Sequence, residues 1–435
     1  MGESRKRHVG TIRPDRWRWH ARAVPAALLI ALAALLLPLP PTASAVVSAA
    51  NWSQYRSGPA HLGLNAQETV LSPSTVSGLR QAWVTTTGDA VTEPAVVDGV
   101  VYVGSADRRV YALNAATGAI IWTATTGGPV RSSPAVVDGV VYAGSTDLKV
   151  YALNAATGAT RWTVTTGGPV SSSPVVVDGV VYVGSADRRV YALDVATGAT
   201  RWTTTTGGRV LDPPAVADGV VYVRARDGNA YALDAATGAI VWTASIGGSP
   251  MFGLPPGTSS PAVADGMVYV AGPYNGRLYA LDAATGATVW TATRGFTVGG
   301  TPAVADGVVY ALLGTGLGTA DLLALNADTG AVVWTVLGGP LSSPSSVSPV
   351  VANGVLYTGT VSGVLVARNP ATGAVLWSDG TAGGSNRSYY ASLVVANGAV
   401  YAGRGFAVSA HRLQIPSRRT RLDGPARRPA PRLAR

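Results

Sequence analysis

Short runs of alternating apolar and polar residues fill most of the chain between residues 83 and 411. The runs are rich in Val, Tyr and Thr, and Asp-Gly, Asn-Gly or Thr-Gly pairs separate them. Alternation with a period of two is typical of half-buried strands, and Asp-Gly and Asn-Gly supply the positive φ that a two-residue hairpin turn requires. The pattern therefore predicts an all-β protein built from hairpins.

The hairpins belong to a repeat of about 40 residues, a length typical of a β-propeller blade with four short strands. Eight Asp-Gly or Asn-Gly pairs are each followed by a Tyr three residues after the Gly. The first residues of these pairs are Asp98, Asp138, Asp178, Asp218, Asp265, Asp306, Asn353 and Asn397. The count predicts an eight-bladed propeller of four-stranded antiparallel blades, and an open solenoid is the alternative.

One Trp per repeat marks the outer strand of each predicted blade. These residues are Trp83, Trp122, Trp162, Trp202, Trp242, Trp290, Trp334 and Trp377. Trp83 precedes the first hairpin, whereas the last hairpin, at Asn397, has no Trp after it. We therefore expect the N-terminal strand around Trp83 to complete the last blade and close the ring. A Trp at a fixed place in every repeat is expected to pack between neighbouring blades, so all eight are assigned a structural role.

The formal net charge of +10 comes from the two ends of the chain. Residues 1–45 carry +5 and residues 412–435 carry +7, whereas residues 46–411 carry −2. The repeats themselves are not basic, so nucleic-acid binding is not predicted. The tail 412–435 holds eight Arg and four Pro and is predicted to be disordered, either inert or bound to an anionic polymer or lipid.

The first 45 residues have the features of an export signal. Basic residues from Arg5 to Arg22 precede an apolar stretch over residues 23–37, and Ala43-Ser44-Ala45 resembles a cleavage site. The apolar stretch is shorter than the roughly 18 residues that a spanning helix needs, so cleavage is predicted and an uncleaved anchor is the alternative. The prediction is a signal peptide over 1–45, a lead-in segment over 46–82, a propeller over 83–411, and a location outside the cell or at its envelope.

The motif Tyr-Ala-Leu-(Asn/Asp)-Ala-x-Thr-Gly-x-x-x-Trp, as in residues 111–122 and 151–162, resembles the tryptophan-docking repeat of the pyrroloquinoline-quinone-like β-propeller superfamily. The lead-in run Trp52-x-x-Tyr55-Arg56-x-Gly58-Pro59 also resembles the segment that precedes such propellers. The resemblance implies the ring architecture and two functional branches. One branch is the quinoprotein dehydrogenases, and the other contains non-catalytic propellers that bind protein partners.

The resemblance implies that a dehydrogenase of this kind holds the quinone and a calcium ion through Glu, Asn and Asp, and uses an Asp base and commonly a Cys pair. This chain has no Cys, and after the signal its only Glu residues are Glu68 and Glu93. Small neutral residues such as Ser132 and Ser172 precede the inner strands and cannot build a cage for a hard cation. We therefore predict the non-catalytic branch, with no catalytic residue, metal or cofactor, and keep a quinone- and calcium-dependent dehydrogenase as the alternative.

Departures from the repeat are the candidate binding residues, because packing occupies the repeated positions. In the fourth blade Arg224 replaces a Gly, and Asp212 replaces a Ser. The sequence leaves open whether these two side chains form a buried ion pair or contact a ligand at the mouth of the central funnel. Glu93 adds one acid near the same mouth.

The inserted loops of the later blades carry apolar and aromatic residues, which predict a binding patch or a loop folded over the funnel. The candidate partner-binding residues are Glu93, Arg209, Asp212, Arg224, Arg226, Phe252 and Tyr274. We predict an exported, monomeric propeller that binds a protein or cell-envelope ligand on the face that carries the basic loops.

Overall fold

The computed structural model describes residues 50–247, 259–273, 275–293, 297–316, 319–337, 347–360, 364–380 and 390–414. The predicted signal peptide, most of the basic tail, Phe252 and Tyr274 lie outside these residues. The described part is almost entirely β, with two 3-10 turns, η1 (Tyr55–Ser57) and η2 (Val76–Gly78). No helix in these ranges is long and apolar enough to span a membrane.

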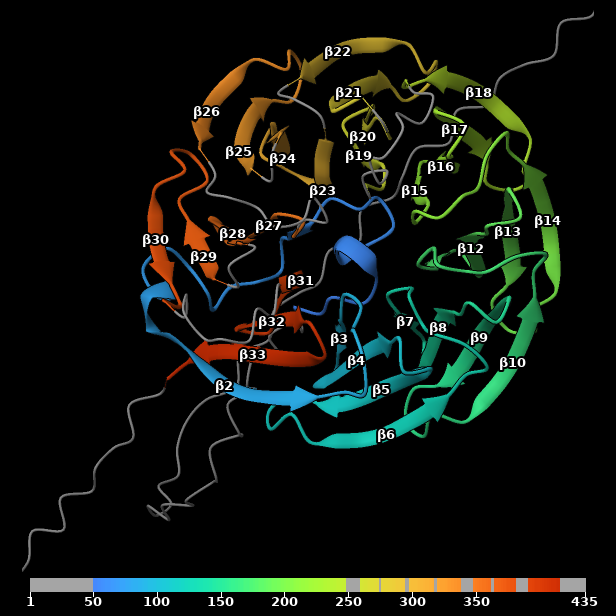
Figure 1. Ribbon diagram of the computed structural model, residues 1–435, viewed down its shortest axis with the longest axis horizontal. Helices are drawn as coiled ribbons and strands as arrows, with labels where there is room; N and C mark the ends of the chain where they lie inside the picture. Colours follow the sequence, from blue (N-terminus) through green and yellow to red (C-terminus); the bar gives the residue numbers. More distant parts are fainter. Residues whose placement is uncertain are drawn as a thin grey trace, which may run out of the picture. The chain divides into compact units, whose positions relative to one another are not determined.

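Eight sheets stand around a central axis and form an eight-bladed propeller (Figure 1). Blade 1 contains β3 (Ala95–Val97), β4 (Val100–Ser105), β5 (Arg109–Asn114) and β6 (Ile120–Thr125). Blade 2 contains β7 (Ala135–Val137), β8 (Val140–Gly144), β9 (Lys149–Asn154) and β10 (Thr160–Thr165). Blade 3 contains β11 (Val175–Val177), β12 (Val180–Gly184), β13 (Arg189–Asp194) and β14 (Thr200–Thr205). Blade 4 contains β15 (Ala215–Ala217), β16 (Val220–Arg224), β17 (Asn229–Asp234) and β18 (Ile240–Ser245).

The second half of the ring repeats this order from the inner to the outer strand. Blade 5 contains β19 (Ala262–Ala264), β20 (Met267–Ala271), β21 (Arg277–Asp282) and β22 (Thr288–Thr293). Blade 6 contains β23 (Thr297–Ala305), β24 (Val308–Gly316), β25 (Thr319–Asn326) and β26 (Val332–Val336). Blade 7 contains β27 (Val350–Ala352), β28 (Val355–Gly359), β29 (Leu365–Arg368) and β30 (Val375–Ser378), and the short β1 (Leu64–Asn65) pairs in parallel with β27. Blade 8 contains β31 (Tyr390–Ala396), β32 (Ala399–Arg404), β33 (Ala407–Leu413) and β2 (Leu79–Thr86).

The N-terminal strand closes the ring, as predicted. Strand β2 pairs antiparallel with β33, and Trp83 lies opposite Ala410. The pair extends to Leu79 opposite Leu413, so the strands pass both predicted boundaries of the propeller, residues 83 and 411. The strands β2 and β33 come from opposite ends of the chain, so no Thr-Gly turn connects them. Their pairing therefore extends past the point at which the other blades have this turn.

The hairpin turns have the predicted geometry. Asp98 and Gly99 both have positive φ, at 49° and 79°, as a two-residue turn that follows the strand twist requires. Asp98 and Arg108 flank opposite ends of β4, so the Asp-Gly turns and the basic loops lie on opposite faces of the ring. We call these the hairpin face and the funnel face.

Within the described residues, seven of the eight blade tryptophans are hydrogen-bonded to a neighbouring blade. The Trp122 indole N–H donates to the Ala155 carbonyl of blade 2 at 2.9 Å. The same ring lies against Gly158, where an added Cβ would come within 2.6 Å of Trp122 Cε3. The Gly of each Thr-Gly turn is thus needed for close approach of the Trp as well as for its positive φ. Seven tryptophans donate to the next blade in this way, namely Trp83, Trp122, Trp162, Trp202, Trp242, Trp290 and Trp334.

Candidate functional site

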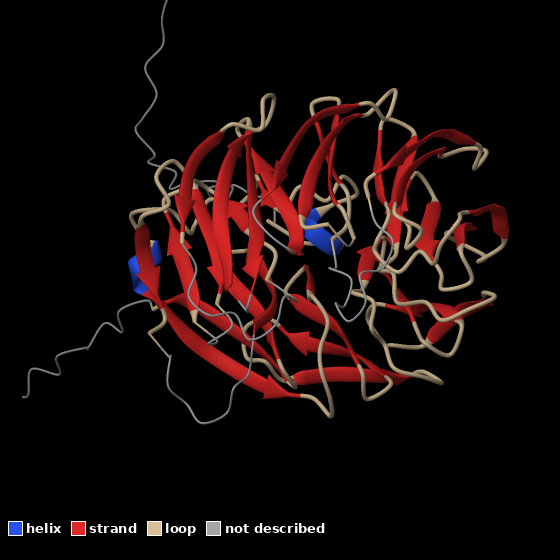
Figure 2. Ribbon diagram, turned by 45° about the horizontal axis from the view of Figure 1, so that its top comes forward, coloured by secondary structure: helices blue, strands red, loops and turns tan. Residues whose placement is uncertain are grey.

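The lead-in segment runs around the inside of the ring and contacts every blade. We call residues 52–65 the plug; its turn η1 lies in the middle of the ring (Figures 1 and 2). Trp52 and Val96 exchange two backbone hydrogen bonds of 2.7 Å. Later residues of the plug accept the N–H groups of the inner strands of blades 2 to 7, and Asn65 Nδ2 donates to the Val395 carbonyl of blade 8. The inner-strand residues bonded to the plug are, in blade order, Val96, Val136, Val176, Val216, Val263, Val304, Val351 and Val395.

A buried arginine holds the plug in an unusual conformation. Arg56 is fully buried with φ of 56°, and its Nη2 donates to the carbonyls of Pro302 and Pro349 in blades 6 and 7. Gly63 lies directly against the guanidinium, where a Cβ would approach Nη2 to 1.9 Å. Any side chain at Gly63 would therefore displace Arg56, which makes this glycine part of the plug.

Glu93 ties the plug to blade 1. Its Oε1 accepts the Trp52 indole N–H at 3.2 Å and the Arg56 backbone N–H at 2.9 Å. Burial raises the pKa of the Glu93 carboxyl, and the nearby Arg56 charge opposes that rise. The carboxylate therefore serves as an acceptor for the plug, which explains why this blade alone carries an acid at the position.

Eight equivalent positions form a ring around the funnel; they lie just before the inner strand in blades 1 to 5 and 7, and within the longer inner strands of blades 6 and 8. In blade order they are Glu93, Ser133, Ser173, Pro213, Ser260, Thr301, Ser348 and Ser392. Several of these residues bond to the next blade: Ser173 Oγ accepts the Ser133 N–H at 2.9 Å, and Ser348 Oγ accepts the Thr301 N–H at 3.0 Å. These hydroxyl oxygens are therefore occupied in holding blades together.

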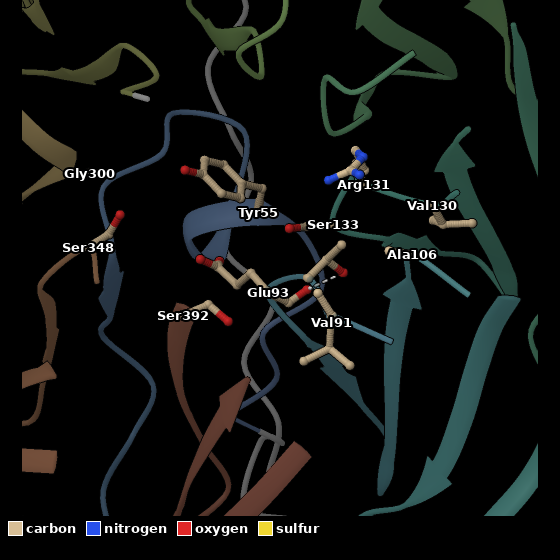
Figure 3. Close-up of a pocket in the computed structure, with 12 residues that line it drawn as sticks. Tyr55, Val91, Glu93, Ala106, Val130, Arg131, Ser133, Gly300, Ser348 and Ser392 are labelled. Carbon is tan, nitrogen blue, oxygen red and sulfur yellow. Dashed lines mark hydrogen bonds between the residues drawn. The ribbon is translucent and has the colours of Figure 1, made fainter. Parts of the chain in front are cut away.

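A cavity of about 250 Å³ lies above the plug on the funnel face. Figure 3 shows Tyr55 and Glu93 at its centre, with Arg131 of blade 2 on one side and Gly300 of blade 6 on the other. The Tyr55 hydroxyl lies 3.0 Å from Thr301 Oγ1. Arg131 is exposed at the rim and is the one cationic side chain lining the cavity within the described ranges. The cavity is thus mostly neutral, and Tyr55 of the plug forms part of its lining.

A buried histidine is expected to make the plug sensitive to acid. His61 is fully buried, its Nδ1 lies 3.2 Å from the Pro261 carbonyl, and its ring packs edge-on against Tyr55. Burial lowers the pKa of His61 to about 3. A depressed pKa contributes stability above the ordinary value of about 6.5, and this contribution is lost as the pH falls towards the folded value.

We therefore expect His61 to reduce the free energy of unfolding by about 2 kcal/mol between pH 6.5 and pH 5. The variant His61→Asn cannot titrate there, and Asn tolerates the positive φ of 58° at this position. Urea unfolding of both proteins at pH 5 and pH 7.5 measures the difference. Equal pH dependence of the two proteins would show that His61 does not carry the acid sensitivity.

The predicted residues of blade 4 come together, but in the interior. Arg224 donates through Nε and Nη2 to Asp212 Oδ2 at 3.0 and 2.7 Å, and through Nη1 to the Ala271 carbonyl of blade 5 at 3.1 Å. Arg226 Nη2 lies 3.6 Å from Asp212 Oδ1. Arg224 is 1% exposed and Asp212 4%. These two form the buried ion pair that the sequence left open, so we no longer expect them to touch a partner directly.

Two residues that line the cavity, Arg131 and Tyr55, were not among the residues predicted from the sequence. Arg209 is exposed on the loop before blade 4, whereas Arg131, which was not predicted, lines the cavity. Arg131 lies one residue before Ser132, at the position where blade 3 has Ser171 and blade 4 has Leu211. It therefore departs from the repeat as Asp212 does, and comparing the blades at this position would have identified it. Tyr55 belongs to the non-repetitive lead-in, and nothing in its sequence indicates that it enters the funnel.

The donor set around the cavity does not fit a quinone with calcium. Calcium takes six to eight oxygen ligands, commonly several of them carboxylates. Within the described residues Glu93 is the one carboxylate that lines the cavity, and its Oε1 already accepts two N–H groups. No cluster of three or more His, Asp or Glu side chains suited to a metal ion occurs in the same ranges. That the protein works without a cofactor remains a prediction.

Comparison with solved structures shows the same fold. The crystal structure of BamB from Moraxella catarrhalis is 23% identical, with a TM-score of 0.62, and the match covers 77% of this chain and 99% of that one. Quinohemoprotein alcohol dehydrogenase from Comamonas testosteroni is 18% identical, with a TM-score of 0.67 and coverages of 83% and 80%. The computationally designed Ika8 protein is 19% identical, with a TM-score of 0.63 and coverages of 75% and 96%.

Comparison of the sequence with curated proteins finds no match. The chain does match a sequence family described as outer membrane protein assembly factor BamB, over residues 69–170, 146–257 and 246–422. These segments overlap and span all eight blades, and they confirm the resemblance to the pyrroloquinoline-quinone-like propellers that the repeats indicated. The protein is therefore a member of the BamB-type family of β-propellers.

Proposed function

We propose that this protein is an exported, non-catalytic scaffold that binds a protein partner at the funnel face of its propeller. The observation that carries the proposal is the state of the funnel's polar groups. The carboxylate of Glu93 is bonded to the plug, and ring hydroxyls such as Ser173 and Ser348 are bonded to neighbouring blades. Glu93 is the one acid among the described lining residues, and the plug already engages it through Oε1, which favours recognition over chemistry.

The funnel face also carries the basic side chains that a protein partner could contact. The loops between the second and third strands bring Arg108 and Arg188 to this side of the ring, and Lys149 begins the third strand of blade 2 at the same end. Arg131 and Arg209 are exposed nearby. Arg side chains are prominent among the residues that dominate interface energies. Family membership supports the same role, because the family is described as an assembly factor of the outer membrane. Phe252 and Tyr274 remain predicted contacts outside the described residues.

Export rests on the amino-terminal sequence. The basic residues, the apolar stretch and the small-residue site before Val46 support cleavage and transport out of the cytoplasm. Protein sequencing of the mature amino terminus from the extracellular fraction tests this part separately. A mature chain that still begins at Met1 and stays in the cytoplasm would contradict it.

Site-specific photo-crosslinking tests the binding face. A benzoylphenylalanine placed at Arg131 on the funnel rim is expected to capture a partner protein in intact cells, because this side chain is exposed beside the cavity. The matched control is the same group at Arg161, an exposed residue of blade 2 whose Nη2 reaches the Gly139 carbonyl on the hairpin face. Capture at Arg161 and not at Arg131 would place the partner on the wrong face for this proposal.

The dehydrogenase alternative is tested directly. Purified protein is incubated with pyrroloquinoline quinone and calcium, and then assayed for bound quinone absorbance and for alcohol-dependent reduction of a dye. We expect neither bound quinone nor turnover, because the cavity offers one engaged carboxylate. Quinone-dependent turnover that Glu93→Gln abolishes would overturn the non-catalytic assignment.

A further inference from the structure

The contact between blades follows a repeated rule at six successive seams, from blade 1 to blade 7. A Tyr hydroxyl and a Trp indole N–H of one blade both donate to a single main-chain carbonyl of the next blade. At the first seam Tyr102 and Trp122 reach the Ala155 carbonyl at 3.2 and 2.9 Å. The six acceptors are the carbonyls of Ala155, Val195, Ala235, Ala283, Ala327 and Pro370.

The seam between blades 7 and 8 lacks this acceptor. In the other blades the carbonyl belongs to the turn that precedes the outer strand, whereas here β33 continues to Leu413 and pairs with Leu79 of β2. The Tyr357 hydroxyl is fully buried without a hydrogen-bond partner, and the Trp377 indole N–H has no acceptor among the described residues. Tyr357 and Trp377 lie in one cross-strand row on either side of Ala367. Closing the ring from two chain ends therefore leaves the buried Tyr357 hydroxyl without an acceptor, and leaves the half-buried Trp377 without the protein acceptor that the other seams provide.

A cavity of about 420 Å³ lies at this seam. Its polar lining includes Ser77, Arg80, Gln81, Trp377, Asp379 and His411. The Trp377 ring packs edge-on against His411 at 6.2 Å between ring centroids, instead of against a tyrosine as in the other blades. His411 is 2% exposed, and its Nδ1 also has no hydrogen-bond partner. The cavity is thus a built pocket with unsatisfied polar groups, and it lies at the rim of the ring, away from the funnel.

We propose that this seam cavity is a peptide-binding site that takes a main-chain carbonyl as the acceptor missing from the Trp377 seam. Trp377 lines the cavity and offers an indole N–H without an acceptor in the described part of the chain, and a peptide carbonyl is the acceptor that the tryptophan at this position binds at six other seams. At the first seam the Trp122 ring lies so close to Gly158 that a Cβ added to this glycine would come within 2.6 Å of the ring. The ligand is therefore a short peptide turn with glycine three residues after the recognised carbonyl, as Gly158 follows Ala155.

A peptide copied from one of the other blades can serve as the probe for this site. A synthetic heptapeptide with the sequence of residues 153–159, Leu-Asn-Ala-Ala-Thr-Gly-Ala, contains the turn that Trp122 binds in blade 2. We expect its addition to the full chain to shift the indole N–H resonance of Trp377 in proton–nitrogen spectra, assigned with Trp377→Phe, and to leave the Trp202 resonance unchanged. A peptide with Val in place of the Gly is the matched control and is not expected to bind.

Variants separate recognition from folding. Trp377→Phe keeps the ring but removes the N–H, so it is expected to weaken peptide binding about fivefold, with its melting temperature close to that of the wild type. Trp202→Phe removes an N–H that already binds Ala235, so it is expected to lower the melting temperature and leave peptide affinity unchanged. If Trp377→Phe binds the peptide as tightly as the wild type, the carbonyl is not recognised by this donor and the proposal fails.

A chain that ends at Gln414 distinguishes the source of the natural ligand. If the heptapeptide binds the full chain and the shortened chain with the same affinity, the site is open to a peptide from another molecule. Tighter binding to the shortened chain means that residues 415–435 compete for the same site, which supports the same recognition in cis. If the Trp377 resonance moves with the heptapeptide in neither chain, the cavity does not bind a peptide carbonyl.

Discussion

A chain that begins at Thr87 is expected to lose the cooperative unfolding transition of the propeller. Such a chain lacks β2, so β33 would be left with an unpaired edge in blade 8. It also lacks Trp83, whose indole N–H bonds to the Ala115 carbonyl of blade 1, and the plug that contacts all eight inner strands. The loss approaches the entire stability of a typical domain, about 5–15 kcal/mol, and an exposed edge strand promotes aggregation.

Two longer chains separate the contribution of the plug to stability from that of β2. A chain that begins at Ser48 keeps the plug and β2 with all the contacts described above, and is therefore expected to melt as the full protein does. A chain that begins at Gln67 keeps β2 but loses the plug, and we expect an intermediate melting temperature. Calorimetry of the three chains measures the order. A chain from Thr87 that melts like the one from Ser48 would show that the ring does not depend on the N-terminal strand.

The repeat carries most of the fold in the sequence itself. Each Asp-Gly pair, each Tyr and each Thr-Gly-x-x-x-Trp has a fixed place in a blade, and the offset of Trp83 from the last hairpin at Asn397 predicts closure. These features are local or periodic, so a single sequence contains them. The strand limits at Leu79 and Leu413 were less predictable, because they depend on the absence of a turn that the other blades have.

The course of the plug through the ring could not be predicted in the same way. Its bonds to the blades are mostly main-chain bonds to a Val of each inner strand, and main-chain bonding leaves little trace in side-chain identity. Buried residues such as Arg56 and His61 occur once, in a segment without alternation. Even Glu93, which the sequence placed near the funnel, was assigned to ligand binding because its acceptor role depends on Trp52 and Arg56 in three dimensions.

Breaking the ion pair of blade 4 is expected to destabilise the propeller by about 3–5 kcal/mol, because a buried charge loses its oppositely charged partner. Asp212→Ser leaves both Arg224 and Arg226 without this carboxylate and is expected to cost more than Arg224→Gly, which leaves Asp212 with Arg226. These substitutions introduce the residues that blade 3 has at the same positions, Ser172 and Gly184, where Ser172 Oγ accepts the Gly184 N–H at 3.1 Å. The Ser and Gly of blade 3 thus form an uncharged, hydrogen-bonded pair at the positions that Asp212 and Arg224 occupy in blade 4.

The double variant Asp212→Ser with Arg224→Gly is therefore expected to lose less stability than Asp212→Ser alone, although a second substitution normally adds to the cost of the first. Urea unfolding of the two single variants, the double variant and the wild type gives the coupling energy between the two positions. A favourable coupling of at least about 1 kcal/mol is expected for residues in direct contact. Strictly additive losses would mean that the two residues act independently, and the departure of blade 4 from the repeat would then need a reason outside the ion pair, such as partner binding.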